Sequence, residues 1–219
     1  MAETSTLVPV ARKRRTYQWM IPTGLVLLSL VPVIAGAMRV SSLALGVETT
    51  PDNARFTGMP LPVIIHIISA TIYCLLGAFQ FQPSFRRRVP RWHRVSGRIL
   101  VPMGITAAAS GLWMTTFYAL PAHDYGALPA ARWIFGLGMI ASILLALRAV
   151  LRRDFSTHRA WMMRGYAIGI GAGTQLFTFL AWLLIAGAAA DATKPVPMIA
   201  GWVINLVIAE WIIRRRPTS

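Results

Sequence analysis

The sequence has few charged side chains. Only 13% of its 219 residues are Asp, Glu, Lys or Arg, whereas 56% are hydrophobic. Soluble proteins are about 25% charged, so this chain has too few polar side chains to cover a surface that faces water. The composition excludes an ordinary soluble domain and indicates an integral membrane protein.

Acidic residues are especially scarce, with 7 Asp and Glu against 22 Lys and Arg, which gives a formal charge of +15. A strong excess of positive charge is also typical of proteins that bind nucleic acid. Here the basic residues lie in short clusters between apolar runs, and this distribution excludes nucleic acid as a partner. No acidic residue lies deep inside an apolar run, so we do not expect a proton relay built from carboxylates.

The chain also lacks the usual signatures of catalysis. Its one cysteine, Cys74, lies inside an apolar run, so it cannot form an intramolecular disulfide and we expect it to pack as a small core residue. There is no hydrolase triad, no phosphate-binding loop and no HExxH zinc motif. We therefore assign no catalytic residue.

What the sequence does contain is six apolar runs, each long enough to cross a bilayer core as about 20 residues of helix. They cover residues 18–38, 61–82, 98–120, 132–151, 160–188 and 197–213. The sequence thus predicts an all-α bundle of six transmembrane helices over 18–213, with a basic segment before it (1–17) and a basic tail after it (214–219). The run at 160–188 is the longest, so we expect it to tilt or to project beyond the bilayer.

The basic residues predict the orientation, because Lys and Arg mark the cytoplasmic connections of membrane proteins. Most of them fall in four clusters, at 12–15, 86–98, 148–164 and 214–216. The opposite connections hold four basic residues mixed with acidic ones: Arg39, Arg55, Arg132 and Lys194 with Glu48, Asp52, Asp124 and Asp191. This alternation predicts a multi-pass protein of the cytoplasmic (inner) membrane with both termini in the cytoplasm. The first apolar run is too long for a typical secretory signal, so we expect it to be retained.

Polar residues form a stripe along two of the predicted helices. The stripe of the second helix is His66, Ser69, Tyr73, Gly77 and Gln80, and that of the fifth is Arg164, Gly171, Gln175, Thr178 and Trp182. Their spacing places each set on one helix face, and we expect the two faces to meet each other or a shared cavity. Such groups either form hydrogen bonds between helices or line a functional site.

Two segments pair His with Arg at the start of a predicted helix: PRWHRVSGR at 90–98 and STHRAWMMRGYA at 156–167. In the predicted topology His93 and His158 lie at the same cytoplasmic level, where helix N-termini favour anions. Ser156 and Thr157 are the expected caps of the fifth helix. With Arg94, Arg98, Arg159 and Arg164, the two helix starts form a positively charged inner mouth.

Three interpretations of this inner mouth stay open. The Arg side chains can anchor the protein to anionic lipid headgroups. His93 and His158 can act as axial ligands of a haem iron, with Arg holding the propionates. The site can also take an anionic or quinone-like small molecule, with Trp161, Met162 and Tyr166 as its walls.

These segments resemble the bacterial predicted membrane protein family known as domain of unknown function 2306. The features that carry the resemblance are His66, Gly77, Gln80, Arg88, His93, Arg94, Gly97 and Arg98, then His158, Arg159, Trp161, Met162, Arg164, Tyr166 and Ala167, and the ending WVINLVIAEWIIRRR. The resemblance covers residues 60–216 and implies a multi-helix membrane fold without an established reaction.

The sequence therefore predicts a protein that binds haem, a quinone or another small lipophilic ligand near the cytoplasmic face, in membrane redox chemistry. The candidate binding residues are His66, His93, His158, Arg94, Arg98, Arg159, Arg164, Tyr73, Gln80 and Tyr166. One alternative is a small-solute permease or channel lined by the two polar stripes. Another is a non-catalytic assembly partner of a membrane complex.

Overall fold

The structure is a computed structural model of the chain, and it describes residues 11–82, 87–121, 124, 126–187 and 193–215, with side chains from residue 19 onward. All regular secondary structure in these residues is helical, which confirms the all-α prediction. The elements are α1 (Ala11–Ala44), α2 (Ala54–Gly58), α3 (Pro60–Ala78), the 3-10 helix η1 (Phe79–Phe81), α5 (Pro90–Phe117), α6 (Ala127–Leu151), α7 (Phe155–Gly169), α8 (Gly171–Ala186) and α9 (Pro195–Arg214).

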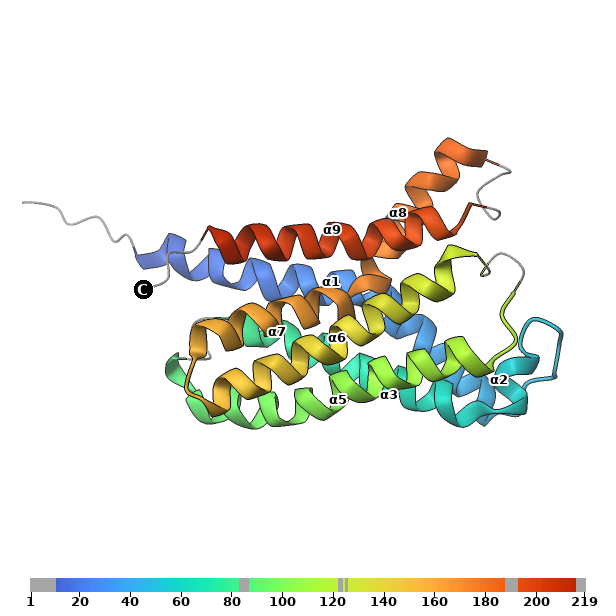
Figure 1. Cartoon of the computed structure of the whole chain (residues 1–219), viewed down its shortest axis with the longest axis horizontal. Coiled ribbons are helices and arrows are strands. Elements are labelled where there is room, and N and C mark those ends of the chain that lie inside the picture. Colours follow the sequence, from blue (N-terminus) through green and yellow to red (C-terminus); the bar gives the residue numbers. More distant parts are fainter. Residues whose placement is uncertain (1–10, 83–86, 122–123, 125, 188–192, 216–219) are drawn as a thin grey trace, which may run out of the picture.

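The helices form an elongated bundle that suits a bilayer (Figure 1). In the described part of the chain, five helices are long and apolar enough to cross a membrane: α1, α3, α5, α6 and α9. The pair α7–α8 makes a sixth span if it is counted as one, although the two helices meet at an angle of 48°. The protein is therefore an all-α polytopic membrane protein, as predicted.

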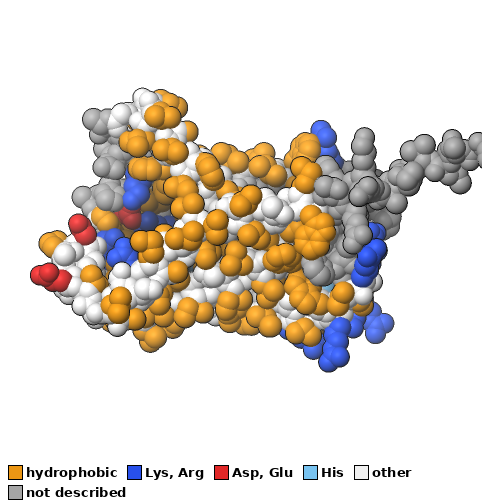
Figure 2. Space-filling view, turned by 180° about the vertical axis from the view of Figure 1, so that it is seen from behind, with side chains coloured by type: hydrophobic (Ala, Val, Ile, Leu, Met, Phe, Trp, Pro, Cys, Tyr) orange, Lys and Arg blue, Asp and Glu red, His pale blue; other side chains and the backbone are white. Residues whose placement is uncertain are grey.

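The distribution of side chains on the surface agrees with this assignment. Figure 2 shows hydrophobic side chains over the long face of the bundle, Lys and Arg without visible acidic side chains at one end, and acidic side chains beside further Lys and Arg at the other. α1 begins and α9 ends at the same end of the bundle (Figure 1). That arrangement matches the predicted sided topology, in which the arginine-rich connections share one face.

Tyr73 of α3 is the centre of the buried core, with only 1% of its surface exposed. Its ring lies between two glycines, because a Cβ added at Gly104 would lie 2.5 Å from Tyr73 Cε2 and one added at Gly169 would lie 2.6 Å from Cε1. Ile143 packs beside it. The small residues of α5 and α7 therefore let three helices close around one aromatic ring, a packing mode typical of membrane bundles.

Two helices begin earlier than predicted. α5 begins at Pro90, since proline fits the first helical position, and α7 begins at Phe155. The prediction that Ser156 and Thr157 cap the fifth helix was wrong, because Asp154 is the cap: its Oδ1 accepts the Thr157 amide N–H at 3.0 Å and the Ser156 hydroxyl at 2.9 Å. These hydrogen bonds, chiefly those with Thr157, lower the pKa of the exposed Asp154 carboxyl.

The predicted helix at 160–188 is broken at Ile170 into α7 and α8. Glycines on both sides of Ile170 weaken the helix there, since glycine is the least favourable helix residue after proline. Asn205 of α9 bridges the break: its Nδ2 donates to the Ala167 carbonyl at 3.0 Å, and its Oδ1 accepts from the Thr174 hydroxyl at 2.8 Å. The buried amide thus gives the Ala167 carbonyl, close to the bend, a hydrogen-bond donor from another helix.

Candidate functional site

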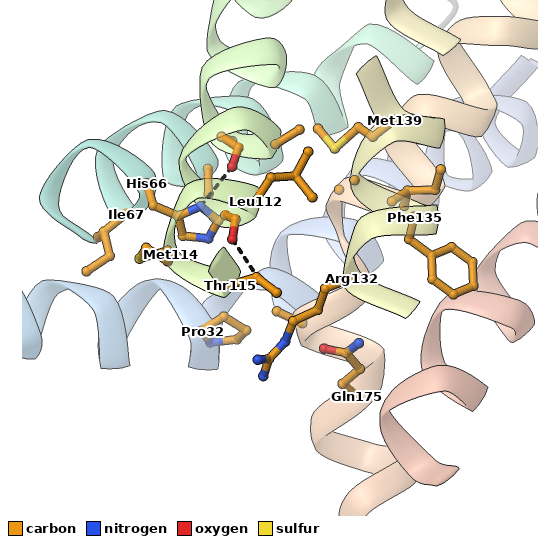
Figure 3. Close-up of a pocket in the computed structure, with 18 of the residues that line it drawn as sticks. Pro32, His66, Ile67, Leu112, Met114, Thr115, Arg132, Phe135, Met139 and Gln175 are labelled. Atoms are coloured by element: carbon orange, nitrogen blue, oxygen red, sulfur yellow. Dashed lines mark hydrogen bonds between the residues drawn. The ribbon is translucent and has the colours of Figure 1, made fainter. Parts of the chain in front are cut away.

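A cavity of about 450 Å³ lies among the helices of one half of the bundle. Its walls come from α1, α2, α3, α5, α6, α7, α8 and α9, and its polar lining includes His66, Tyr73, Thr115, Arg132 and Gln175. Figure 3 shows His66, Arg132 and Gln175, from three different helices, pointing toward the same space. The two predicted polar stripes therefore do meet at a cavity, although only some of their members reach it.

The cavity opens toward one end of the bundle and is closed at mid-depth. On α3 the lining ends at Cys74, on α5 at Ala107, on α6 at Met139 and on α7 at Ile168. On each of these helices, the residue named is the lining residue that lies farthest from the connections that carry Arg55 and Asp124. The open end of the cavity is therefore the end at which these connections lie. In the predicted topology these connections lie outside the cytoplasm, so the cavity faces the outer side.

His66 is oriented by the neighbouring helix α5. Its Nδ1 lies 2.9 Å from the Ala107 carbonyl oxygen and 3.3 Å from the Ser110 hydroxyl. Because a carbonyl can only accept, Nδ1 carries the proton in this arrangement, which leaves Nε2 as an acceptor in the neutral ring. Nε2 has no hydrogen-bond partner within the described part of the chain. The ring thus offers one acceptor at the cavity wall.

Two cations share one carboxylate at the mouth of the cavity. Arg132 Nη2 lies 2.7 Å from Asp124 Oδ2, and Lys194 Nζ lies 3.0 Å from Asp124 Oδ1. Burial opposes ionisation of Asp124, but the hydrogen bonds from Arg132 and Lys194 outweigh it and lower the pKa of its carboxyl. The cluster joins the connection before α6, α6 itself and the start of α9.

Arg55 adds a further positive charge to the lining. Its guanidinium lies 4.6 Å from the centre of the Phe56 ring, and that of Arg39 lies 4.7 Å from the same centre. Neither arginine has a carboxylate within 4.0 Å among the residues that the structure describes. Among the described residues that line the cavity, Arg55 and Arg132 face one carboxylate, that of Asp124, so positive charge exceeds negative charge in the lining.

The break between α7 and α8 forms part of the cavity wall, since Gly169, Ile170 and Gly173 all line it. Trp202 packs against Gly171, where there is no Cβ to exclude its indole, and it stacks on Phe135 with ring centres 4.8 Å apart. Gln175 is held by a hydrogen bond from its Nε2 to the Met198 carbonyl at 2.9 Å. The broken span, an aromatic pair and a fixed amide thus lie together.

Three of the predicted binding residues join helices elsewhere instead of lining this cavity. Gln80 Nε2 donates to the Ser96 hydroxyl at 2.6 Å, and the Tyr166 hydroxyl donates to the Cys74 carbonyl at 2.7 Å. Arg164 forms a forked ion pair with Glu210 of α9, with Nη2 3.1 Å from Oε2. Glu210 also pairs with Arg214 of the same helix, one turn later, with Nε 3.8 Å from Oε2.

The two His-Arg segments lie at the opposite end of the bundle and are not part of the lining. His158 Nδ1 lies 2.9 Å from the Ala146 carbonyl, so Nδ1 donates and Nε2 is left unprotonated in the neutral ring. A metal-binding histidine typically has this second hydrogen bond, so His158 suits a haem ligand. His93 and Arg159 are half-buried, and Arg94 and Arg98 are exposed. The haem site at His93 and His158 stays a prediction.

The sequence reasoning missed several residues of the cavity, including Arg132, Asp124, Thr115 and Trp202. From the sequence, Arg132 and Asp124 are assigned only to the charged residues of an outer connection. The position of Arg132, five residues after the start of α6, is a usable signal, because an arginine about 8 Å inside a helix end needs a partner or a cavity.

No curated protein and no solved structure matches this chain. A family model described as a predicted membrane protein, domain of unknown function 2306, matches residues 63–213. This segment contains α5 to α9 and nearly all of α3, and thus most of the cavity wall, whereas α1 and α2 lie before it. On this match the chain belongs to the predicted membrane protein family of domain of unknown function 2306.

Proposed function

We propose that this protein is a permease for a small solute and that the cavity is the solute-binding site in an outward-open state. The observation that carries the proposal is the broken span α7–α8 beside the cavity. Irregular backbone at membrane depth is tolerated where it lines a cavity or is buried in protein, and broken helices at mid-membrane are a feature of transporter binding sites.

The lining supports a solute site in preference to a structural void. A void left by imperfect packing is apolar, whereas this one receives His66, Arg132 and Gln175 from three helices. Its volume is within the range of small-molecule sites, about 300–1,000 Å³. Below it, the Tyr73 ring is clamped between Gly104 and Gly169, which gives the closed inner side that an outward-open permease requires.

Transport assays in proteoliposomes test this proposal. Purified protein is reconstituted, and influx of a panel of radiolabelled small solutes, neutral and charged, is compared with that of protein-free vesicles. We expect influx of at least one solute to depend on the protein and to fall about tenfold or more in His66→Ala, since a lost buried polar contact of this kind is worth about 1–3 kcal/mol.

His158→Ala is the matched control, because His158 also bonds through Nδ1 to a backbone carbonyl but lies away from the cavity. Influx that is abolished by His158→Ala and unchanged by His66→Ala would move the function to the inner His-Arg segments. Absence of influx for every solute, with folded protein in the vesicles, would contradict a permease.

A further inference from the structure

From the charges around the cavity we infer the class of solute: a small organic monoanion, such as a carboxylate, that carries an apolar body. This inference rests on the proposed function, because it names the occupant of the same cavity. It follows from an imbalance of charge at the mouth and from the separation of charged and apolar walls, two features that the permease proposal does not use.

The imbalance is set by Asp124, which faces two cations. Its carboxylate neutralises one unit of the charge of Arg132 and Lys194, at 2.7 and 3.0 Å. Arg55 adds a third cation to the mouth: its guanidinium lies over the Phe56 ring and has no carboxylate within 4.0 Å among the described residues. An anion that enters the cavity therefore meets positive charge that the Asp124 carboxylate leaves unneutralised in the described lining, and the low dielectric of a membrane protein strengthens the attraction.

Arg132 is the group best placed to hold the anion. One of its nitrogens, Nη2, is occupied by Asp124, and no other hydrogen bond from its guanidinium is found in the described residues. Figure 3 shows the guanidinium reaching into the space between α1 and α8, away from the α6 backbone. Arginine presents five N–H donors in a planar fork that suits a carboxylate.

The apolar part of the solute is inferred from the remaining walls. Phe135 and Trp202 form a stacked aromatic pair, and Leu112 and Met139 continue the lining toward its closed end. His66 lies about 9 Å from the start of α3, and Arg132 about 8 Å from the start of α6, so the two polar groups lie at similar depth. A solute with a charged head at this level and an apolar body below or beside it fits both walls.

Calorimetric titration of the protein in phosphatidylcholine nanodiscs tests the inference with three probes. Benzoate carries both the charge and the apolar body, benzyl alcohol keeps the body without the charge, and acetate keeps the charge without the body. We expect benzoate to bind at least about tenfold more tightly than either of the others, since a charged hydrogen bond is worth about 1.5–3 kcal/mol.

Two variants and a matched control assign the effect to the mouth. Arg132→Gln and Arg55→Gln should each weaken benzoate binding about tenfold. Arg39→Gln should leave it within about twofold, because Arg39 lies on the same Phe56 ring but does not line the cavity. Arg55→Gln breaks no ion pair in the described residues, so it reports on binding even if Arg132→Gln unfolds.

The outcomes separate the two proposals. If benzyl alcohol binds as tightly as benzoate and both depend on His66, the cavity is a solute site but the inference of an anion is wrong. Equal losses in Arg39→Gln and Arg55→Gln would show diffuse surface attraction and overturn it too. Loss of benzoate binding in phosphatidylglycerol nanodiscs would identify a lipid headgroup as the occupant, again against the inference. If no probe binds and no solute is transported, the permease proposal itself fails.

Discussion

The packing of Tyr73 predicts that two similar Gly→Ala substitutions on α5 have opposite effects. A Cβ added at Gly104 would lie 2.5 Å from Tyr73 Cε2 and 2.6 Å from Ile143 Cδ1, whereas one added at Gly97 would have nothing within 4 Å. The ring has little room to move aside, because Gly169 packs against its opposite edge: a Cβ added there would lie 2.6 Å from Tyr73 Cε1. Replacing a helical glycine with alanine favours the helix by about 1 kcal/mol, and overpacking a core costs about 1–3 kcal/mol.

Because the ring is blocked on two opposite edges, we take the free-energy cost of overpacking to be about 3 kcal/mol, the upper end of that range. Gly104→Ala should then lower the free energy of unfolding by about 2 kcal/mol, and Gly97→Ala should raise it by about 1 kcal/mol. The assay is unfolding in mixed detergent micelles, followed by tryptophan fluorescence. Combining Gly104→Ala with Tyr73→Leu should recover stability relative to the sum of the single changes. Equal stability of the two alanine variants would refute this account of the core.

Three further predictions concern the mouth, the broken span and the inner end. Asp124 has a lowered pKa, so its ion pairs should stabilise the protein fully above about pH 4, the ordinary range of an aspartate, and that contribution should be lost as pH falls through the folded pKa. Melting temperatures should therefore depend less on pH below 4 in Asp124→Asn. Asn205→Leu leaves the Ala167 carbonyl and the Thr174 hydroxyl without their partner, which should destabilise the protein by about 1–3 kcal/mol in micelle unfolding. For the predicted haem, protein expressed with sufficient haem should show a Soret band that His158→Ala removes, and lack of the band in the parent would exclude it.

Five of the six predicted spans are confirmed as single helices, and the sixth corresponds to the bent pair α7–α8. These spans could be predicted from the sequence because each depends mainly on local composition. An apolar run of about 20 residues has few alternatives to a membrane helix. The break at Ile170 was not predicted, since the run at 160–188 contains no proline. Two features accompany the break: the glycines on both sides of Ile170 and the hydrogen bond from Asn205 of α9. The glycines are visible in the sequence, but the Asn205 contact is a tertiary contact, which helical periodicity cannot show.

The candidate site was predicted less completely, for a related reason. Helical spacing correctly placed His66, Tyr73 and Gln175 on faces that meet a cavity. It could not separate them from Gln80 and Arg164, which share those faces but find partners in Ser96 and Glu210. Whether a polar residue lines a cavity or joins two helices depends on what lies opposite it, and the sequence of one helix does not contain that information.

In an outward-open permease, water reaches the cavity from the outer side of the membrane. Neighbouring positions on α5 test it: Ala108 lines the cavity, whereas Ala109 is exposed on the outside of the bundle and does not line it. Both lie about 12–14 Å from the end of α5. In a Cys74→Ala background, each is changed to cysteine and treated, in intact cells, with a charged methanethiosulfonate that cannot cross membranes. We expect modification of Ala108→Cys and none of Ala109→Cys. An unmodified Ala108→Cys, or equal modification of both, would contradict an outward-open cavity.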